Sequence, residues 1–118
     1  MGQSTPFRRL AIVVEDEDIQ REMITLLLEE SGFWVIQCED AETASLALKA
    51  RHPALLITDI NLVGKMSGIE LAQLARAADP ALRVMVISGQ PPTSPLPDGV
   101  TFFSKPVYPI ELIREAAH

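Results

Sequence analysis

The chain has 118 residues, of which 47% are hydrophobic and 22% charged, a composition that fits one compact globular domain and excludes a disordered or fibrous protein. Ten Lys and Arg residues against sixteen Asp and Glu leave a net charge of −6, which argues against direct binding to a nucleic acid. Cys38 is the only cysteine, which excludes an internal disulfide, and no apolar run approaches the roughly 20 residues needed to cross a bilayer. We therefore expect a cytoplasmic protein, not inserted in a membrane, with a tail over residues 1–8 and one domain over 9–118.

Apolar runs and segments of helical spacing alternate from the start of the chain. The first run, residues 10–14, is rich in β-branched residues and is followed by a helical pattern that stops at Ser31-Gly32. A second run covers 33–38, after which Asp40 can cap a helix that Pro53 ends. This half of the chain is therefore predicted to be strand, helix, strand, helix.

The same alternation continues in the second half. A third run over 54–58 precedes a loop and then a capping box, Ser67 to Glu70, that starts a third helix. Runs over 83–87 and 101–104 predict two more strands, and Pro109 suits the first turn of a final helix. Because strands that alternate with helices form parallel sheets covered on both faces, we expect an α/β fold with a five-stranded, doubly wound parallel sheet.

One segment interrupts the pattern between the last two strands. Residues 90–99 contain four prolines in ten residues, which excludes a regular helix. The fourth helix is therefore predicted to be shortened or replaced by a proline-rich loop.

Polar residues follow four of the predicted strands directly. They are Glu15 and Asp16 after the first strand, Asp59 after the third, Ser88 after the fourth and Lys105 after the fifth. Ligands of open parallel sheets sit at the carboxyl ends of the strands, so these groups are expected to meet. Three carboxylates in one crevice need a cation, and an all-oxygen ligand set is typical of Mg²⁺. A carboxylate beside a metal and a lysine can accept a phosphoryl group.

Each of these residues also has a purely structural explanation. The acidic residues at 15–18 favour the start of a helix, and Asp59 alone is more often a turn or cap residue. The joint placement of carboxylates, hydroxyl and ammonium at consecutive strand ends is what indicates a site.

From Leu10 to about Ala116, the chain resembles the receiver domains of two-component response regulators. The resemblance is carried by the acidic pair in Val13-Val-Glu-Asp-Glu17, by Leu55-Leu-Ile-Thr-Asp59 and by Phe103-Ser-Lys-Pro106, in this order. It implies a flavodoxin-like fold with strand order 2-1-3-4-5.

The resemblance also implies roles for the acidic residues. Asp59 would be the phosphoacceptor and a metal ligand, and Asp16 would bind Mg²⁺ directly. Glu15 would bind the metal through water, and the backbone carbonyl of Asn61 would be a further ligand. Lys105 would contact the phosphoryl group.

The resemblance implies two further residue roles on the last two strands and one feature of the backbone after them. Ser88 falls at the position of the hydroxyl residue that moves toward the phosphoryl oxygens, and Phe102 at that of the rotating aromatic residue of the switch. The peptide bond between Lys105 and Pro106 would be cis.

Two segments depart from the family pattern. Residues 60–68 form a stretch one residue longer than usual that lacks the usual proline, which leaves the loop beside Asp59 and the role of Asn61 open. The proline-rich segment, residues 90–99, replaces a helix that many family members use for dimerisation or output.

The implied function is a signalling switch and not an enzyme that acts on other substrates. Asp59 would take a phosphoryl group from a histidine kinase or phosphotransfer protein, and an unidentified protein target would respond. A receiver-like interaction module that is never phosphorylated is the alternative. A metal-dependent phosphatase would need a second carboxylate near Asp59, where Asn61 stands instead. The kinase, the oligomeric state (a homodimer included) and membership of a longer protein stay open.

Overall fold

The computed structural model describes residues 9–117, and the expected tail over 1–8 lies outside the described residues. Strands and helices alternate except between the last two strands, as the sequence predicts. In chain order they are β1 (Arg9–Val14), α1 (Asp18–Glu30), β2 (Phe33–Cys38), α2 (Ala41–Ala50), β3 (Leu55–Asp59), α3 (Gly68–Ala78), β4 (Arg83–Ser88), β5 (Val100–Ser104) and α4 (Pro109–Ala116).

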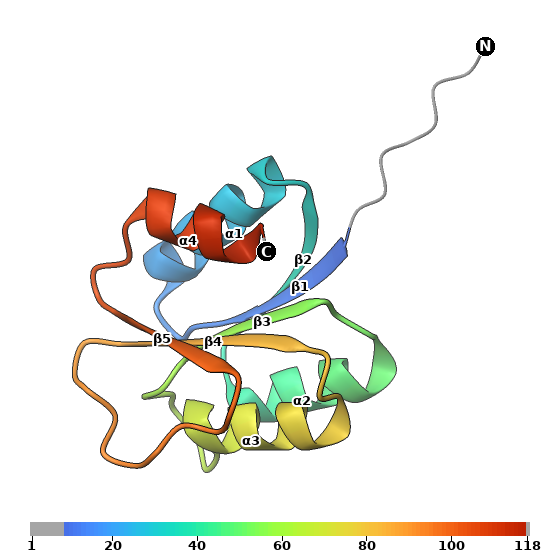
Figure 1. Cartoon of the computed structure of the whole chain (residues 1–118), viewed down its shortest axis with the longest axis vertical. Helices are drawn as coiled ribbons and strands as arrows, with labels where there is room; N and C mark the ends of the chain where they lie inside the picture. The colour runs from blue at the N-terminus through green and yellow to red at the C-terminus, as the bar shows by residue number, and fades with distance from the viewer. Residues whose placement is uncertain (1–8, 118) are drawn as a thin grey trace.

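The five strands form one parallel sheet in the order β2-β1-β3-β4-β5. Helices α1 and α4 cover one face of the sheet, and α2 and α3 cover the other (Figure 1). The expected doubly wound fold and strand order are therefore confirmed. Within the described residues, no helix is both long and apolar enough to span a membrane.

The core has two halves, one on each face of the sheet. Alternate residues of a strand point to opposite faces, so Leu56 of β3 packs toward α2 and α3 while Ile57 packs toward α1 and α4. All five residues of β3 are buried. A central strand that is apolar on both faces is what a sheet covered by helices on both sides requires.

The predicted helix signals are present in the structure. The Asp40 side chain accepts a hydrogen bond from the Thr43 backbone N–H at 2.7 Å and so caps α2. The Ser67 hydroxyl accepts from the Glu70 backbone N–H, and the Glu70 carboxylate accepts from the Ser67 N–H, which completes the capping box of α3. Pro109 lies in the first turn of α4.

The β4–β5 connection, residues 89–99, contains no helix, as its prolines predict. Arg76 of α3 holds its far end: the guanidinium donates to the Asp98 carbonyl at 3.1 Å and also to the carbonyls of Pro80 and Leu82. Gly99 has a φ of +82° and lies so close to Arg76 that an added Cβ would be 2.6 Å from the guanidinium. One arginine therefore ties the proline-rich loop to α3.

Candidate functional site

The carboxyl ends of β1, β3, β4 and β5 bring the predicted polar residues to one edge of the sheet. Glu15, which follows β1, is 2% exposed, Asp59, the last residue of β3, is 6% exposed, and Ser88, the last residue of β4, is 1% exposed. Asp16 is exposed next to Glu15. Burying a charged carboxylate costs free energy unless it is paired, so partners are expected for Glu15 and Asp59.

Lys105 supplies that partner. Its ammonium nitrogen lies 2.5 Å from Asp59 Oδ2 and 3.1 Å from Glu15 Oε1, and it donates a hydrogen bond to each. The lysine side chain is 25% exposed, so the ammonium group lies at the mouth of the cluster. Lys105 thus binds two carboxylates that lie far from it in the sequence, Asp59 at 46 positions and Glu15 at 90 positions.

The two neighbouring residues Thr58 and Asn61 hydrogen-bond to the backbone carbonyl and the carboxylate of Asp59. The second carboxylate oxygen, Oδ1, accepts a hydrogen bond from the Asn61 N–H at 3.0 Å, and the Thr58 hydroxyl donates to the Asp59 carbonyl at 2.8 Å. Gly68, the first residue of α3, packs directly against this carbonyl, and a Cβ atom added there would lie only 1.9 Å from the Asp59 carbonyl oxygen. Only glycine allows the helix to begin so close to the strand end.

The pKa values of Glu15 and Lys105 are both raised, for different reasons. Burial raises the pKa of the Glu15 carboxyl to about 7; the hydrogen bond from Lys105 offsets part of the rise and the charge of Asp59 adds to it. Burial alone would lower the pKa of Lys105, but its hydrogen bonds to Asp59 and Glu15 outweigh that effect and raise the pKa. Lys105 is therefore a permanent cation at neutral pH.

The donor set fits a hard divalent cation. Glu15, Asp16 and Asp59 each offer a carboxylate oxygen, and these three oxygens lie within 4.8 Å of one another. Three carboxylates against one ammonium leave an excess of negative charge when all are ionised, and the charge of Asp59 adds to the rise in the Glu15 pKa that burial causes. All-oxygen ligands and an exposed entry side at Asp16 suit Mg²⁺, which keeps several of its waters.

The side chains of Ser88, Phe102 and Asn61 make no hydrogen bond to the side chains of Asp59 or Lys105 among the described residues. Their backbones do connect to these two residues, because the Lys105 N–H donates to the Ser88 carbonyl at 2.9 Å and the Asn61 N–H donates to Asp59 Oδ1. The Ser88 hydroxyl accepts a hydrogen bond from the Gln90 N–H at 3.2 Å, at the start of the proline-rich loop. Phe102 is partly buried against the core on the α2 and α3 face. The Asn61 side chain is exposed, and the Lys105-Pro106 peptide bond is cis.

Arg21 is a supporting residue that the sequence patterns did not reveal. Its guanidinium donates to the Glu15 backbone carbonyl at 2.7 Å and pairs with Asp18 at 2.6 Å, so α1 holds the turn that carries the acidic pair. The spacing of three residues between Asp18 and Arg21 was the one signal in the sequence for the ion pair, but the contact with Glu15 depends on how α1 packs.

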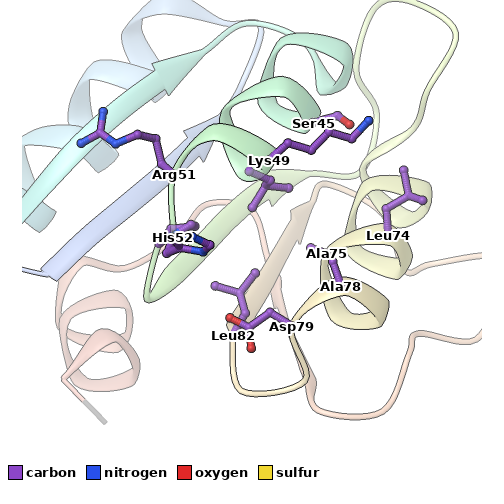
Figure 2. A pocket seen from close by; sticks show the side chains of 11 residues that line it. Ser45, Lys49, Arg51, His52, Leu74, Ala75, Ala78, Asp79 and Leu82 are labelled. Carbon is purple, nitrogen blue, oxygen red and sulfur yellow. The ribbon is translucent and has the colours of Figure 1, made fainter.

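A cavity of about 390 Å³ lies elsewhere in the molecule. It is formed by α2, α3 and the segments that precede β3 and β4, where Leu74, Ala78 and Leu82 face His52 across it (Figure 2). These segments lie at the amino ends of the strands, and Asp59 lies at the carboxyl end of β3. The acidic cluster is therefore an open site at the opposite edge and does not share this cavity.

A parallel sheet in the order 2-1-3-4-5 with an acidic cluster and a lysine at its carboxyl edge defines the class of protein, a receiver-type signalling domain. Residues 11–116 match the family model described as the response regulator receiver domain, and the chain belongs to this family.

Similar proteins agree with this assignment. The response regulator receiver protein CpdR of Brucella abortus is 32% identical over 109 residues, which cover 88% of this chain and 90% of that protein. The solved receiver domain of the hybrid histidine kinase CckA is 31% identical with a TM-score of 0.80, over 92% of this chain and 95% of the other. A receiver protein from Sinorhizobium medicae has a TM-score of 0.86 at 24% identity, over 93% of this chain and 92% of the other, and supports the fold.

Proposed function

We propose that this chain is a phosphoacceptor receiver domain in which Asp59 takes a phosphoryl group from a histidine kinase or phosphotransfer protein. The observation that carries the proposal is the buried Asp59 carboxylate, with one oxygen held by Lys105 at 2.5 Å and the other by the Asn61 N–H at 3.0 Å. A carboxylate held in one orientation beside a cation is prepared for attack at an incoming phosphorus atom.

In the proposed step, a carboxylate oxygen of Asp59 attacks the phosphorus of a phosphohistidine. An O–P bond forms, the P–N bond breaks, and its electron pair goes to the leaving histidine nitrogen. The Lys105 ammonium, already hydrogen-bonded to Asp59, neutralises charge on the transferred phosphoryl oxygens. Water later hydrolyses the acyl phosphate and restores the Asp59 carboxylate.

Mg²⁺, bound by Asp16 and Asp59 with the Asn61 carbonyl and with Glu15 through water, would supply further positive charge for the phosphoryl oxygens. The three carboxylates that support this part of the proposal lie within 4.8 Å of one another. A cation also relieves the repulsion between them.

The phosphoryl group would act as a switch by adding negative charge and acceptor oxygens. Ser88 lies at the end of β4, and its hydroxyl reorients to donate to a phosphoryl oxygen. Because the Gln90 N–H is hydrogen-bonded to this hydroxyl, the movement reaches the proline-rich loop, and Phe102 on the neighbouring strand responds to the same change. We propose a signalling switch with a downstream protein target, located in the cytoplasm, whose functional domain covers residues 9–118.

Intact-mass measurement after incubation with acetyl phosphate tests the proposal. We expect one phosphoryl adduct on the wild type with Mg²⁺ and none with the metal chelated. Asp59→Asn removes the adduct, whereas Asp98→Asn, which changes an exposed aspartate in the β4–β5 connection, keeps it. A wild type without an adduct, or an adduct that survives in Asp59→Asn, would rule out Asp59 as phosphoacceptor. A result without any adduct would favour the interaction module.

A further inference from the structure

The loop between β3 and α3, residues 60–67, follows Asp59 directly and carries Asn61. Its ends are fixed by backbone hydrogen bonds: the Ile60 N–H donates to the Ile87 carbonyl, and the Gly68 N–H donates to the Ile60 carbonyl, both at 2.9 Å. Its middle is largely exposed, including Val63 at 61%. Leu62 and Met66 are partly buried against the core on the α2 and α3 face, but residues 63–65 between them are exposed and gain no order from apolar packing.

Glu42 supplies a fixed point for this middle section. It lies in the first turn of α2, and its Oε2 atom accepts hydrogen bonds from the backbone N–H groups of Lys65 at 2.9 Å and Met66 at 3.1 Å. Hydrogen bonds from its own backbone N–H and from those of Lys65 and Met66 hold the pKa of the Glu42 carboxyl below its usual value. It is therefore a charged acceptor, and such hydrogen bonds are stronger than neutral ones.

Gly64 shows that the loop is closely fitted to this carboxylate. Its φ is +104°, a conformation that residues with a side chain rarely adopt. A Cβ atom added there would lie 3.0 Å from Glu42 Oε1. The loop thus bends around Glu42 at a position where only glycine is free of strain.

We propose that Glu42 is a positioning residue that holds the β3–α3 loop so that the Asn61 backbone carbonyl is presented to the metal-binding carboxylates. The Asn61 N–H is anchored on Asp59 and the Lys65 N–H on Glu42, so only residues 62–64 lie between the two anchors. This segment has few conformations left while both contacts persist. Glu42 takes over the stiffening that the proline missing from this loop would provide. The inference rests on the proposed function, because it assumes that the cluster binds Mg²⁺.

Three variants separate the carboxylate's role from its charge. Glu42→Ala removes the acceptor, and Glu42→Gln keeps a side-chain carbonyl that can accept both hydrogen bonds. Gly64→Ala disturbs the fit from the loop side without changing any charge. Glu22→Ala is the matched control, because Glu22 is an exposed residue of α1 with no ion pair or side-chain hydrogen bond among the described residues.

The first measurement is the Mg²⁺ dissociation constant of each protein by isothermal titration calorimetry, which needs no phosphorylation. Residues that orient metal ligands typically change metal affinity by about 10–100-fold when removed, so we expect about a 10-fold weaker affinity for Glu42→Ala. Gly64→Ala should weaken Mg²⁺ binding in the same direction. Glu42→Gln and Glu22→Ala should stay close to the wild type.

The second measurement reports the loop alone, in metal-free protein. Trypsin cleaves after Lys65, and the N–H of that peptide bond is the Met66 N–H that Glu42 holds. Glu42→Ala should speed cleavage at this bond severalfold, while a urea titration of the same variant checks that the whole domain is still folded.

Unchanged Mg²⁺ affinity in Glu42→Ala would overturn the inference, even where the wild type still forms its phosphoryl adduct. A wild type that does not bind Mg²⁺ would overturn it as well. A wild type that binds Mg²⁺ but forms no adduct would instead refute the phosphoacceptor function, and the affinities would still decide the role of Glu42. Faster cleavage together with weaker Mg²⁺ binding supports it.

Discussion

Replacing Lys105 with methionine removes the cation that contacts two carboxylates which are at most 6% exposed, Glu15 and Asp59. Removing one partner of a fully buried ion pair costs about 3–5 kcal/mol. Two features of this site lower that figure. The lysine side chain keeps 25% of its exposure, and Glu15, with a pKa of about 7, takes up a proton more readily than an ordinary carboxyl. We therefore expect Lys105→Met to lower the free energy of unfolding by about 2–3 kcal/mol without Mg²⁺.

Urea unfolding at pH 8 with the metal chelated measures this loss. Urea m-values are about 1–3 kcal/mol per M, so a loss of that size moves the midpoint down by roughly 1–1.5 M at a mid-range m-value. Lys49→Met is the control, because Lys49 is exposed and has no ion pair among the described residues. Its effect should stay within about 0.5 kcal/mol.

A double-mutant cycle with Asp59→Asn isolates the contact between the two side chains. Once Asp59 is neutral, the loss of the lysine leaves only one buried carboxylate without a partner, so the double variant should be more stable than the two single losses together imply. We expect a coupling energy of at least about 1 kcal/mol, well above the roughly 0.3–0.5 kcal/mol within which independent sites add. Additive losses would show that Lys105 and Asp59 do not pair in solution and would refute the reasoning.

Three further predictions test the core, a helix cap and the cysteine. Leu112→Ala should lower the free energy of unfolding by about 3–5 kcal/mol because this α4 side chain is fully buried. Ile110→Ala, at a side chain that is 69% exposed on the same helix, should cost less than about 0.5 kcal/mol. Equal losses in denaturant titrations would contradict the packing of α4 on the sheet. Ser67→Ala should cost about 1 kcal/mol by removing the cap of α3, as measured by thermal unfolding, and no loss would mean that the capping box does not form in solution. Burial, and next the charge of Asp40, raise the pKa of the buried Cys38 thiol. A disulfide reagent should therefore react slowly with the native protein at pH 8 and rapidly in urea. Rapid reaction in native buffer would show that β2 opens readily.

Local signals in the sequence predicted the elements because each signal acts over a few residues. The capping box at Ser67 and the cap at Asp40 satisfy backbone groups three residues away, and the prolines of residues 90–99 exclude a helix whatever the surroundings. The edge of the sheet at which the polar residues gather was also predictable, for a topological reason. Parallel strands all end at one edge, so residues that directly follow apolar runs have to meet there.

Not every apolar residue at helical spacing faces the core. Ile19 is 81% exposed although it lies one turn before Met23, which packs against the core, whereas Leu46 is 67% exposed because it lies on the opposite side of α2 from Ala44 and Leu48. Periodicity places a residue on a side of its helix, but the extent of the neighbouring sheet determines whether that part of the helix is covered.

The sequence by itself determined the family, the order of strands and helices, the lack of a helix between the last two strands and the identity of the residues at the carboxyl edge of the sheet. The tertiary structure alone decided which of those residues touch. Lys105 lies between Asp59 and Glu15, Arg21 holds the Glu15 carbonyl, and Glu42 holds the β3–α3 loop. Local patterns carry no information on these contacts, because their partners lie on different elements whose separation is set by how the helices pack on the sheet.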